Sequence, residues 1–324
     1  MIVILRPDAE PESVQRALVA RGLWVQRLDG SRQTQFAIEP CSAAVEAASL
    51  LDIEGVLDVV RPASPHPKLD RAARSVRVGA ANFEAERPPV LIAGPCSVES
   101  EEQIHRIARE VARHGAKLLR GGAYKPRTSP YAFAGHGAVA LGWMRDAADA
   151  ADLGVVTEVL SPSDASLVAR TADMLQIGSR NMQNFALLRA AAAEQKPILL
   201  KRGLAATVEE WLLAAEHCLA HGAPAVVLCE RGIRSWDHST RNLLDLGAVA
   251  LLSHVHGLPV VVDPSHGAGR RDLVLPLARA AIAVGAAGVM VETHFDPGSA
   301  QSDGAQALPL SDVARLGDLM RTAR

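Results

Sequence analysis

The chain has few aromatic residues and little net charge. Phe, Trp and Tyr together make up 3% of its 324 residues, and the formal net charge at pH 7 is -2. Proteins that bind nucleic acids usually present a basic surface, and single-strand binders add aromatic side chains on which bases stack. The composition therefore favours no nucleic acid partner, and any binding of anions has to be local.

Long apolar runs are also lacking. No run approaches the length of about 18 residues that crosses a bilayer. The polar segment Arg6-Pro7-Asp8 follows only a few apolar residues at the N-terminus, which does not fit a signal peptide. We therefore expect a soluble, cytoplasmic protein with no membrane partner.

Cysteine is sparse as well. The four cysteines, at positions 41, 96, 218 and 229, lack the paired spacing of a disulfide framework or a zinc ribbon. At least three of them are expected to be plain buried thiols. Hydrophobic residues make up 48% of the chain, which is ordinary for a globular protein and enough for a large core.

Residues 1–62 have the pattern of a small domain of their own. The expected strands and helices are, in order, Ile2–Leu5, Pro11–Arg21, Trp24–Leu28, Gln33–Ile38, Ser42–Leu51 and Val56–Val60. This βαββαβ order is that of the ferredoxin-like fold. No cluster of catalytic residue types lies here, so we expect either a regulatory module or one that mediates oligomer contacts. The Pro-rich residues 63–89 are expected to form a linker with room for a short hairpin.

Strands and helices alternate from Val90 onward. Val90–Ala93 is a continuous apolar run, which is typical of a strand buried on both faces of a parallel sheet. The expected strands are Val90–Ala93, Lys117–Arg120, Val155–Val159, Met174–Ile177, Ile198–Lys201, Ala225–Cys229, Val260–Val262 and Gly288–Val291. Eight such strands can close, so residues 90–324 predict an α/β fold of the (β/α)8 TIM barrel type. A doubly wound open sheet is the alternative, but no Gly-rich dinucleotide fingerprint follows the first strand.

Charged residues stand at or just after the ends of these strands. They are Arg120, Lys125, Arg127, Glu158, Arg180, Lys201, Arg202, Glu230, Arg231, Asp263, His266, Glu292 and His294. Taken singly, each is more often a solvated surface group. A barrel, however, brings the carboxyl ends of all its strands to one rim, where such barrels carry their active sites. Several Arg and Lys side chains around one cavity suit phosphate and carboxylate groups, so we expect a strongly anionic substrate.

A second set of residue types at this rim suits a metal ion. Cys96, His266, Glu292 and Asp303 would offer a thiolate, an imidazole and two carboxylates, with Asp296 as the alternative to Asp303. This mixture favours a divalent transition metal ion such as Mn, Fe, Co or Zn over Mg or Ca. Without the other ligands, Cys96 would be interpreted as a buried thiol and His266 as a loop histidine bonded to the backbone.

Longer motifs surround these residues. They are Ala-Gly-Pro-Cys-Ser-Val-Glu at 93–99, Leu-Arg-Gly-Gly-Ala-Tyr-Lys-Pro-Arg-Thr-Ser-Pro at 119–130, Gln-Ile-Gly-Ser-Arg-Asn-Met-Gln-Asn at 176–184, Leu-Lys-Arg-Gly at 200–203, Cys-Glu-Arg-Gly at 229–232, Val-Asp-Pro-Ser-His at 262–266 and Val-Glu-Thr-His at 291–294. With these motifs the chain resembles the 3-deoxy-D-arabino-heptulosonate 7-phosphate (DAHP) synthases that carry an N-terminal ferredoxin-like regulatory domain. The resemblance implies condensation of phosphoenolpyruvate with erythrose 4-phosphate and release of phosphate, the first step of the shikimate pathway.

The resemblance also implies a role for each candidate residue. The implied metal ligands are Cys96, His266, Glu292 and Asp303. The implied contacts of phosphoenolpyruvate are Arg120 and Lys125 at its carboxylate, and Arg180, Lys201 and Arg231 at its phosphate. Arg127 and Thr128 would bind the phosphate of erythrose 4-phosphate, and Asp263 one of its hydroxyls. We expect Lys125 to donate a proton to the developing alkoxide, and Glu158 or His266 to manage the water.

Two other functions stay open. One is the related synthase that condenses phosphoenolpyruvate with arabinose 5-phosphate, against which the Lys-Pro-Arg-Thr motif at 125–128 argues. The other is a non-catalytic regulatory barrel, which would have no chemical need for all the candidate ligands. The resemblance further implies that residues 1–62 bind an aromatic amino acid as effector, and we also expect a homo-oligomer.

Overall fold

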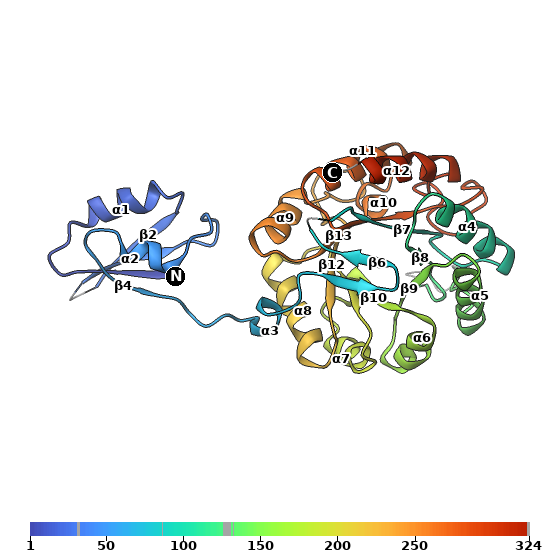
Figure 1. Ribbon diagram of the computed structural model, residues 1–324, viewed down its shortest axis with the longest axis horizontal. Coiled ribbons are helices and arrows are strands. Elements are labelled where there is room, and N and C mark those ends of the chain that lie inside the picture. The colour runs from blue at the N-terminus through green and yellow to red at the C-terminus, as the bar shows by residue number, and fades with distance from the viewer. Residues whose placement is uncertain (31–32, 86, 126–130, 132, 323–324) are drawn as a thin grey trace. The chain divides into compact units, whose positions relative to one another are not determined.

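The computed structural model describes residues 1–30, 33–85, 87–125, 131 and 133–322 (Figure 1). The chain divides into two compact units, Met1–Pro65 and His66–Arg324. Each of them has a hydrophobic core of its own. In the described residues no helix combines the length and the apolar character that a membrane crossing requires.

The first unit has the expected ferredoxin-like arrangement. Its elements are β1 (Ile2–Leu5), α1 (Pro11–Val19), β2 (Val25–Asp29), β3 (Thr34–Ile38), α2 (Ala47–Leu51) and β4 (Val56–Val60). The strands form one antiparallel sheet in the order β2-β3-β1-β4. Alternate residues of β1 point into the core, where Val3 and Leu5 pack with Phe36. The period of two in β1 therefore decides which face of the sheet is buried.

Helix α2 is shorter than the predicted helix over Ser42–Leu51. The hydroxyl of Ser42 donates to the carbonyl oxygen of Trp24 and accepts from its backbone N–H, and the backbone N–H of Ala43 donates to the Gly22 carbonyl. These bonds tie residues 42–43 to the segment before β2. A helix cannot begin until the chain has left that segment.

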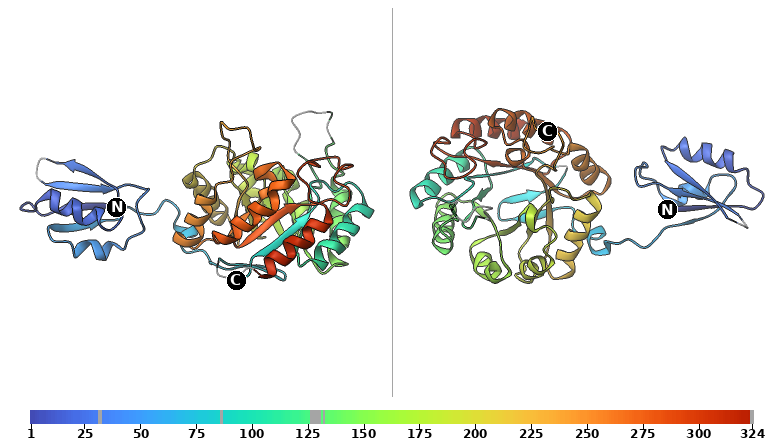
Figure 2. Two further views of the ribbon diagram at one scale, coloured as in Figure 1. Left: turned by 90° about the horizontal axis from the view of Figure 1, so that it is seen from above. Right: turned by 180° about the vertical axis from the view of Figure 1, so that it is seen from behind.

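The second unit is a closed barrel of eight parallel strands, as predicted, and not an open sheet (Figures 1 and 2). The strands are β7 (Val90–Gly94), β8 (Leu118–Arg120), β9 (Gly154–Glu158), β10 (Met174–Ile177), β11 (Ile198–Lys201), β12 (Val226–Glu230), β13 (Val260–Val262) and β14 (Gly288–Glu292). Each strand pairs in parallel with its neighbours, and β14 closes the circle onto β7. Each of the eight predicted strands is present, and its ends lie within one residue of the predicted ends.

Helices cover the outer face of the barrel (Figure 1). They are α4 (Glu101–Arg113), α5 (Ala138–Asp149), α6 (Ala165–Thr171), α7 (Phe185–Ala193), α8 (Val208–Ala220), α9 (Leu246–Ala250), α11 (Arg271–Ala283) and α12 (Leu310–Thr322). The short helix α10 (Pro264–Ala268) instead follows directly on β13, at the carboxyl ends of the strands. Helix α4 begins after Ser100, whose hydroxyl accepts from the Gln103 backbone N–H, and it buries Ile104 and Ile107. Such a cap and an apolar stripe are what a helix lying on a barrel requires.

A short hairpin lies across one end of the barrel interior (Figure 1). Its strands are β5 (Val76–Val78) and β6 (Ala81–Phe83), and they follow the short helix α3 (Pro67–Asp70). Phe83 is fully buried and packs in the same cluster as Ile92, Leu118 and Val156 inside the barrel. We predicted a linker over residues 63–89 with room for a short hairpin. The hairpin is present, but residues from His66 onward belong to the barrel unit, because the hairpin's apolar side chains are buried against the barrel. The opposite end, with the carboxyl ends of the strands, is left for the site.

Candidate active site

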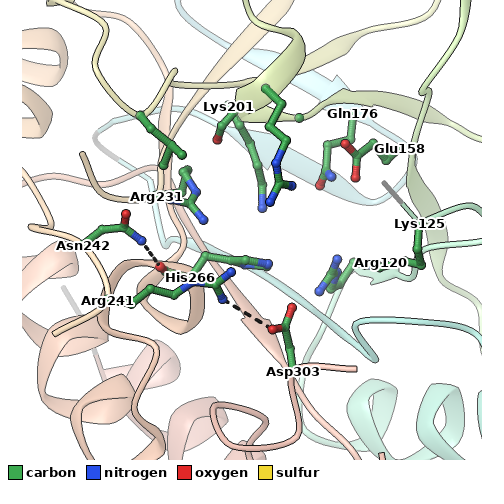
Figure 3. Close-up of a pocket in the computed structure, with 14 residues that line it drawn as sticks. Arg120, Lys125, Glu158, Gln176, Lys201, Arg231, Arg241, Asn242, His266 and Asp303 are labelled. Atoms are coloured by element: carbon green, nitrogen blue, oxygen red, sulfur yellow. Dashed lines mark hydrogen bonds and ion pairs between the residues drawn. The ribbon is translucent and has the colours of Figure 1, made fainter. Parts of the chain in front are cut away.

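The carboxyl ends of the barrel strands surround a cavity of about 170 Å³ (Figure 3). Its described lining is Arg120, Lys125, Glu158, Gln176, Gly178, Ser179, Arg180, Lys201, Leu204, Arg231, Arg241, Asn242, His266 and Asp303. Eight residues that the sequence analysis predicted for the site lie in this lining. They stand at or after the ends of seven different strands, β8 to β14. The barrel thus gathers them as its topology requires.

Positive charge is only partly compensated in this lining. Of the ion pairs that the described residues form, none includes Lys125, Arg180 or Arg231. Arg231 is nearly buried, and burial lowers its pKa. A buried guanidinium without a carboxylate partner is costly, and an anionic group bound in the cavity would offset that cost. The cavity is therefore prepared for an anion.

Lys201, Asp263 and His266 form one chain of contacts beside the cavity. Asp263 caps α10, and its Oδ2 lies 2.5 Å from Lys201 Nζ and 2.7 Å from His266 Nδ1. Burial opposes the charge on Asp263, but His266 and Lys201 hold its pKa well below the usual range. The carboxylate fixes the imidazole with Nδ1 as donor, which leaves the lone pair of Nε2 for another partner. Burial also lowers the pKa of His266.

The Nε2 atom of His266 faces Glu292 at the end of β14. Nε2 lies 3.3 Å from Glu292 Oε1, which also accepts a hydrogen bond of 2.6 Å from Arg120 Nη1. Burial would raise the pKa of Glu292, but His266, Arg120 and Lys125 outweigh it and lower the pKa to about 2. The carboxylate is therefore ionised throughout the neutral range.

Cys96 and Asp303 complete a cluster of electron-rich donors with Glu292. One ligand atom of each of these three residues lies within 4.8 Å of the others, and Cys96 Sγ is 3.2 Å from Asp303 Oδ2. Burial raises the pKa of the Cys96 thiol to about 12, and the charge of Glu292 adds to this. Asp303 has a φ of 53°, an uncommon conformation for a residue other than glycine and one often found at functional sites.

These four residues fit a divalent transition metal ion. Ligand atoms of Cys96, Glu292 and Asp303 lie together, and His266 Nε2 contacts Glu292 Oε1. A thiol, an imidazole and two carboxylates form a mixed donor set that suits such a cation. Asp303 is the aspartate that lies here. Asp296 instead accepts a hydrogen bond from the backbone of Gly298, in the turn that follows His294.

Gly94 allows this cluster to form. A Cβ atom added at Gly94 would lie 1.9 Å from the carbonyl oxygen of Arg120. The close approach of β7 to β8 therefore needs a residue without a side chain at this point. It places Cys96 beside the end of β8.

Residues 77–323 match the family described as the DAHP synthetase I family. The chain belongs to the DAHP synthetase I family. It is 43% identical over 320 residues to the phospho-2-dehydro-3-deoxyheptonate aldolase of Thermotoga maritima, covering 95% of this chain and 93% of that protein. The crystal structure of phospho-2-dehydro-3-deoxyheptonate aldolase (DAHP synthase) from the same organism superimposes with a TM-score of 0.78 at 41% identity, covering 99% of this chain and 96% of that one.

A second group of relatives matches a smaller part of this DAHP synthetase family member. The 2-dehydro-3-deoxyphosphooctonate aldolase of Bradyrhizobium diazoefficiens is 34% identical over 263 residues. The match covers 76% of this chain and 93% of that protein. Both groups therefore share most of the barrel's length with this chain, and the first also matches it over the small unit.

The structure separates the charged rim residues of this family member into two sets. Arg202 does not face the cavity, because its Nη1 pairs with Glu230 Oε2 at 3.0 Å and with Asp245 Oδ2 at 2.9 Å. His294 stacks on Phe295, away from the cavity lining. These side chains stabilise the loops around the site, although in sequence they stand at strand ends like the others.

Other residues at the site were not predicted from the sequence. They are Gln176, Gly178, Ser179, Leu204, Arg241 and Asn242 in the lining and Gln306 beside it. Gln176 carried a signal, because it is a polar residue inside the otherwise apolar run of β10. Arg241, Asn242 and Gln306 carried none, since they lie in loops well after the strands.

Two predicted residues cannot be placed. Arg127 and Thr128 lie outside the described residues. The described chain reaches Lys125, whose Nζ lies 3.0 Å from Cys96 Sγ and 3.1 Å from the Cys96 carbonyl oxygen. Lys125 thus connects the cavity lining to the donor cluster.

Proposed function

We propose that this protein is a DAHP synthase, which condenses phosphoenolpyruvate with erythrose 4-phosphate to give DAHP and phosphate, the first step of the shikimate pathway. One observation carries the proposal. Unpaired cationic side chains line a cavity whose lining also includes His266 and Asp303, and Asp303 belongs to a donor cluster with Cys96 and Glu292. The same cavity therefore offers contacts for anionic substrates and donor atoms for a metal ion.

Phosphoenolpyruvate would bind through two groups of cations. We assign Arg120 and Lys125 to its carboxylate, and Arg180, Lys201 and Arg231 to its phosphate. All five lie in the cavity lining, and the three without an ion-pair partner among the described residues belong to this set. Arginine can grip a carboxylate or phosphate with two hydrogen bonds, while lysine acts as a point charge.

Erythrose 4-phosphate would need a separate cationic pocket, because two anionic substrates repel each other. We assign its phosphate to Arg127 and Thr128, as the resemblance implies. For Asp263 the geometry supports a role in orienting His266 better than contact with a hydroxyl of the sugar. Asp263 is 1% exposed, and Lys201 and His266 occupy its carboxylate.

Cys96, His266, Glu292 and Asp303 would hold a divalent metal ion such as Mn, Fe, Co or Zn. When bound, such an ion supplies Lewis-acid polarisation of a carbonyl oxygen. The chain's own contribution is to keep the donors ready. Arg120 and Lys125 hold Glu292 ionised, and Asp263 holds the His266 ring with its Nε2 toward Glu292.

The reaction then requires that both substrates are held in reacting geometry. Carbon 3 of phosphoenolpyruvate attacks the aldehyde carbon and forms the new C–C bond, while the aldehyde oxygen takes up a proton. Water adds at carbon 2 and gives a hemiketal phosphate. The bond between carbon 2 and the phosphate ester oxygen then breaks, which releases phosphate and leaves a ketone at carbon 2. Lys125 would donate the proton, since it lies in the lining beside the donor cluster. Glu158 or His266, also in the lining, would position the water.

A second candidate follows from the second group of relatives. A phosphooctonate product has one carbon more than a heptonate, so the three carbons of phosphoenolpyruvate would join a five-carbon sugar such as arabinose 5-phosphate. The Lys-Pro-Arg-Thr motif at 125–128 and the fuller match to the heptonate aldolase favour the four-carbon substrate. The convergence of Cys96, Glu292 and Asp303 in one cluster, with Asp303 in the cavity lining, disfavours a non-catalytic barrel.

The test is an assay of phosphate release from phosphoenolpyruvate with each sugar phosphate, before and after chelation. We expect turnover with erythrose 4-phosphate, its loss on chelation and its return with added divalent metal. Activity that persists in protein shown by elemental analysis to be free of metal would exclude the metal site. A preference for arabinose 5-phosphate would replace the first candidate by the second.

We further propose that the small unit is a regulatory domain that binds an aromatic amino acid. Among the described residues, none of those that line the cavity and none of the proposed ligands lies in the first unit. An effector that binds one arrangement of the two units more tightly than another increases the population of that arrangement. If the arrangements differ in activity, the effector changes the activity of the enzyme. We also propose a cytoplasmic homo-oligomer.

A further inference from the structure

A buried glutamine lies against the donor cluster without being part of the cavity lining. Gln306 is 3% exposed, and its Nε2 donates to Glu292 Oε2 at 2.5 Å. Its Oε1 accepts from Arg241 Nη1 at 3.1 Å. Because a carboxylate only accepts and a guanidinium only donates, these two neighbours decide the orientation of the amide between them.

The two oxygens of Glu292 therefore have different partners. Oε1 faces Arg120 and His266, while Oε2 is held by Gln306. The last torsion of a glutamate side chain is broad, so the carboxylate would turn easily if one oxygen lost its partner. Without the Gln306 amide, Oε2 would also be a buried acceptor without its donor. Gln306 thus determines the plane in which the Glu292 carboxylate meets the cluster.

Arg241 and its neighbour Asn242 connect this glutamine to the other donors. Arg241 Nη1 also lies 3.4 Å from Asp303 Oδ1, and Asn242 Nδ2 donates to the carbonyl oxygen of His266 at 2.9 Å. The backbone N–H of Arg241 donates to Ala268 at the end of α10. One dipeptide in the loop after β12 therefore contacts the segments that carry His266 and Asp303 and, through Gln306, reaches Glu292.

We propose that Gln306, oriented by Arg241, is a positioning residue that holds Glu292 in the geometry for binding a divalent metal ion. The inference rests on the proposed metal site and adds to it a residue that supplies no ligand atom. Hydrogen-bonded partners of metal ligands commonly set metal affinity, because a ligand that must first be ordered binds less tightly. An isosteric apolar residue at 306 removes the donor without removing a ligand.

The test compares Gln306→Met with Gln301→Met in the full-length protein. Met has a similar length but donates no hydrogen bond, and Gln301 is an exposed glutamine of the same loop. The metal-free proteins are titrated with Co²⁺ against a chromophoric chelator, and the thiolate-to-cobalt absorption of Cys96 is recorded. We expect Gln306→Met to bind Co²⁺ about 10- to 100-fold more weakly with an altered spectrum. Gln301→Met should match the parent, and at saturating metal the KM for phosphoenolpyruvate should be unchanged in both.

Each outcome decides a different point. A parent protein that shows no thiolate-to-cobalt absorption would overturn the proposed metal site itself. A parent that binds Co²⁺ and a Gln306→Met variant with the same affinity and spectrum would overturn only the positioning role.

A second pair of variants applies if Gln306→Met does not fold. Arg241 is 43% exposed, so Arg241→Met is expected to fold, and it removes the partner that orients the Gln306 amide. We expect a loss of Co²⁺ affinity in Arg241→Met that Arg241→Lys, which can still donate to Gln306 Oε1, partly restores. Parental Co²⁺ affinity in Arg241→Met would overturn the proposal.

Discussion

At the scale of single residues, the function of a charged side chain depends on whether it already has a partner. Arg202 and Arg231 both follow barrel strands and are both nearly buried. Arg202 pairs with Glu230 and Asp245, whereas no ion pair of the described residues includes Arg231. Only the second can offer its whole charge to a ligand. Loss of Arg202 would leave the buried Glu230 carboxylate without its ion-pair partner, and such a loss usually lowers the stability of the fold rather than the affinity for a ligand.

This difference leads to a prediction about the two substrate phosphates. Arg231→Ala should raise the KM for phosphoenolpyruvate much more than that for erythrose 4-phosphate, because it removes a charge-assisted contact worth about 1.5 to 3 kcal/mol, or roughly ten- to a hundredfold. Arg127→Ala should show the reverse preference. Steady-state kinetics with each substrate varied in turn measures both. Equal effects on the two substrates in either variant would contradict the assignment of separate pockets.

At the scale of elements, the hairpin β5–β6 shows how a segment outside the barrel pattern becomes part of its core. Val76, Val78, Ala81 and Phe83 are all buried at one end of the barrel interior. The strands of the barrel leave that end open to solvent unless something covers it. The hairpin covers it with apolar side chains, so it is expected to stabilise the barrel and to take no part in the chemistry.

Phe83→Ala should accordingly destabilise the barrel and leave its kinetics unchanged. Loss of a fully buried phenylalanine typically costs about 3 to 5 kcal/mol in the free energy of unfolding. Arg77→Ala is the matched control, since Arg77 is exposed on the same hairpin. Urea denaturation followed by circular dichroism measures the change. If the two variants unfolded at the same urea concentration, the hairpin would not be part of the barrel core.

At the scale of the whole molecule, the two units have separate cores, and all the site residues that the structure describes lie in the second unit. Helix α3, at the start of the second unit, is held to the barrel. The carboxylate of Glu216 on α8 accepts from the backbone N–H groups of Lys68 and Leu69, at 3.1 and 2.7 Å, and Leu69 is buried. A barrel without the small unit should therefore begin at His66, so that α3 is kept.

We expect such a protein, residues 66–324, to be active but insensitive to effectors. The full-length protein should be inhibited by tyrosine, phenylalanine or tryptophan, and the shortened one by none of them, because the proposed effector site lies in residues 1–65. Activity with and without each amino acid measures this, and circular dichroism controls for folding. A full-length protein indifferent to all three, or a shortened one that is still inhibited, would contradict the regulatory role.

Much of the fold was predictable because its signals are local. The apolar runs that become β10, β11 and β13 were predicted with the ends that the structure shows. A strand that is buried on both faces is recognisable from a short apolar run bounded by residues that end a strand. The prediction was less accurate where contacts distant in sequence decide the structure. Ser42 is held by Trp24 and so delays α2, and the hairpin at 76–83 is ordered by the barrel interior.

The sequence alone determined that this protein has eight buried strands, a small domain before them, and a rim of charged residues with a thiol and an imidazole. These follow from residue types and their spacing along the chain. Only the tertiary structure decided which of those charges lack partners, that Asp263 is occupied by Lys201 and His266, and that Arg241 and Gln306 reach the donor cluster. The physical reason is that hydrogen bonds and ion pairs act over a few ångströms in space. Barrel closure decides which side chains come that close, and no local pattern records it.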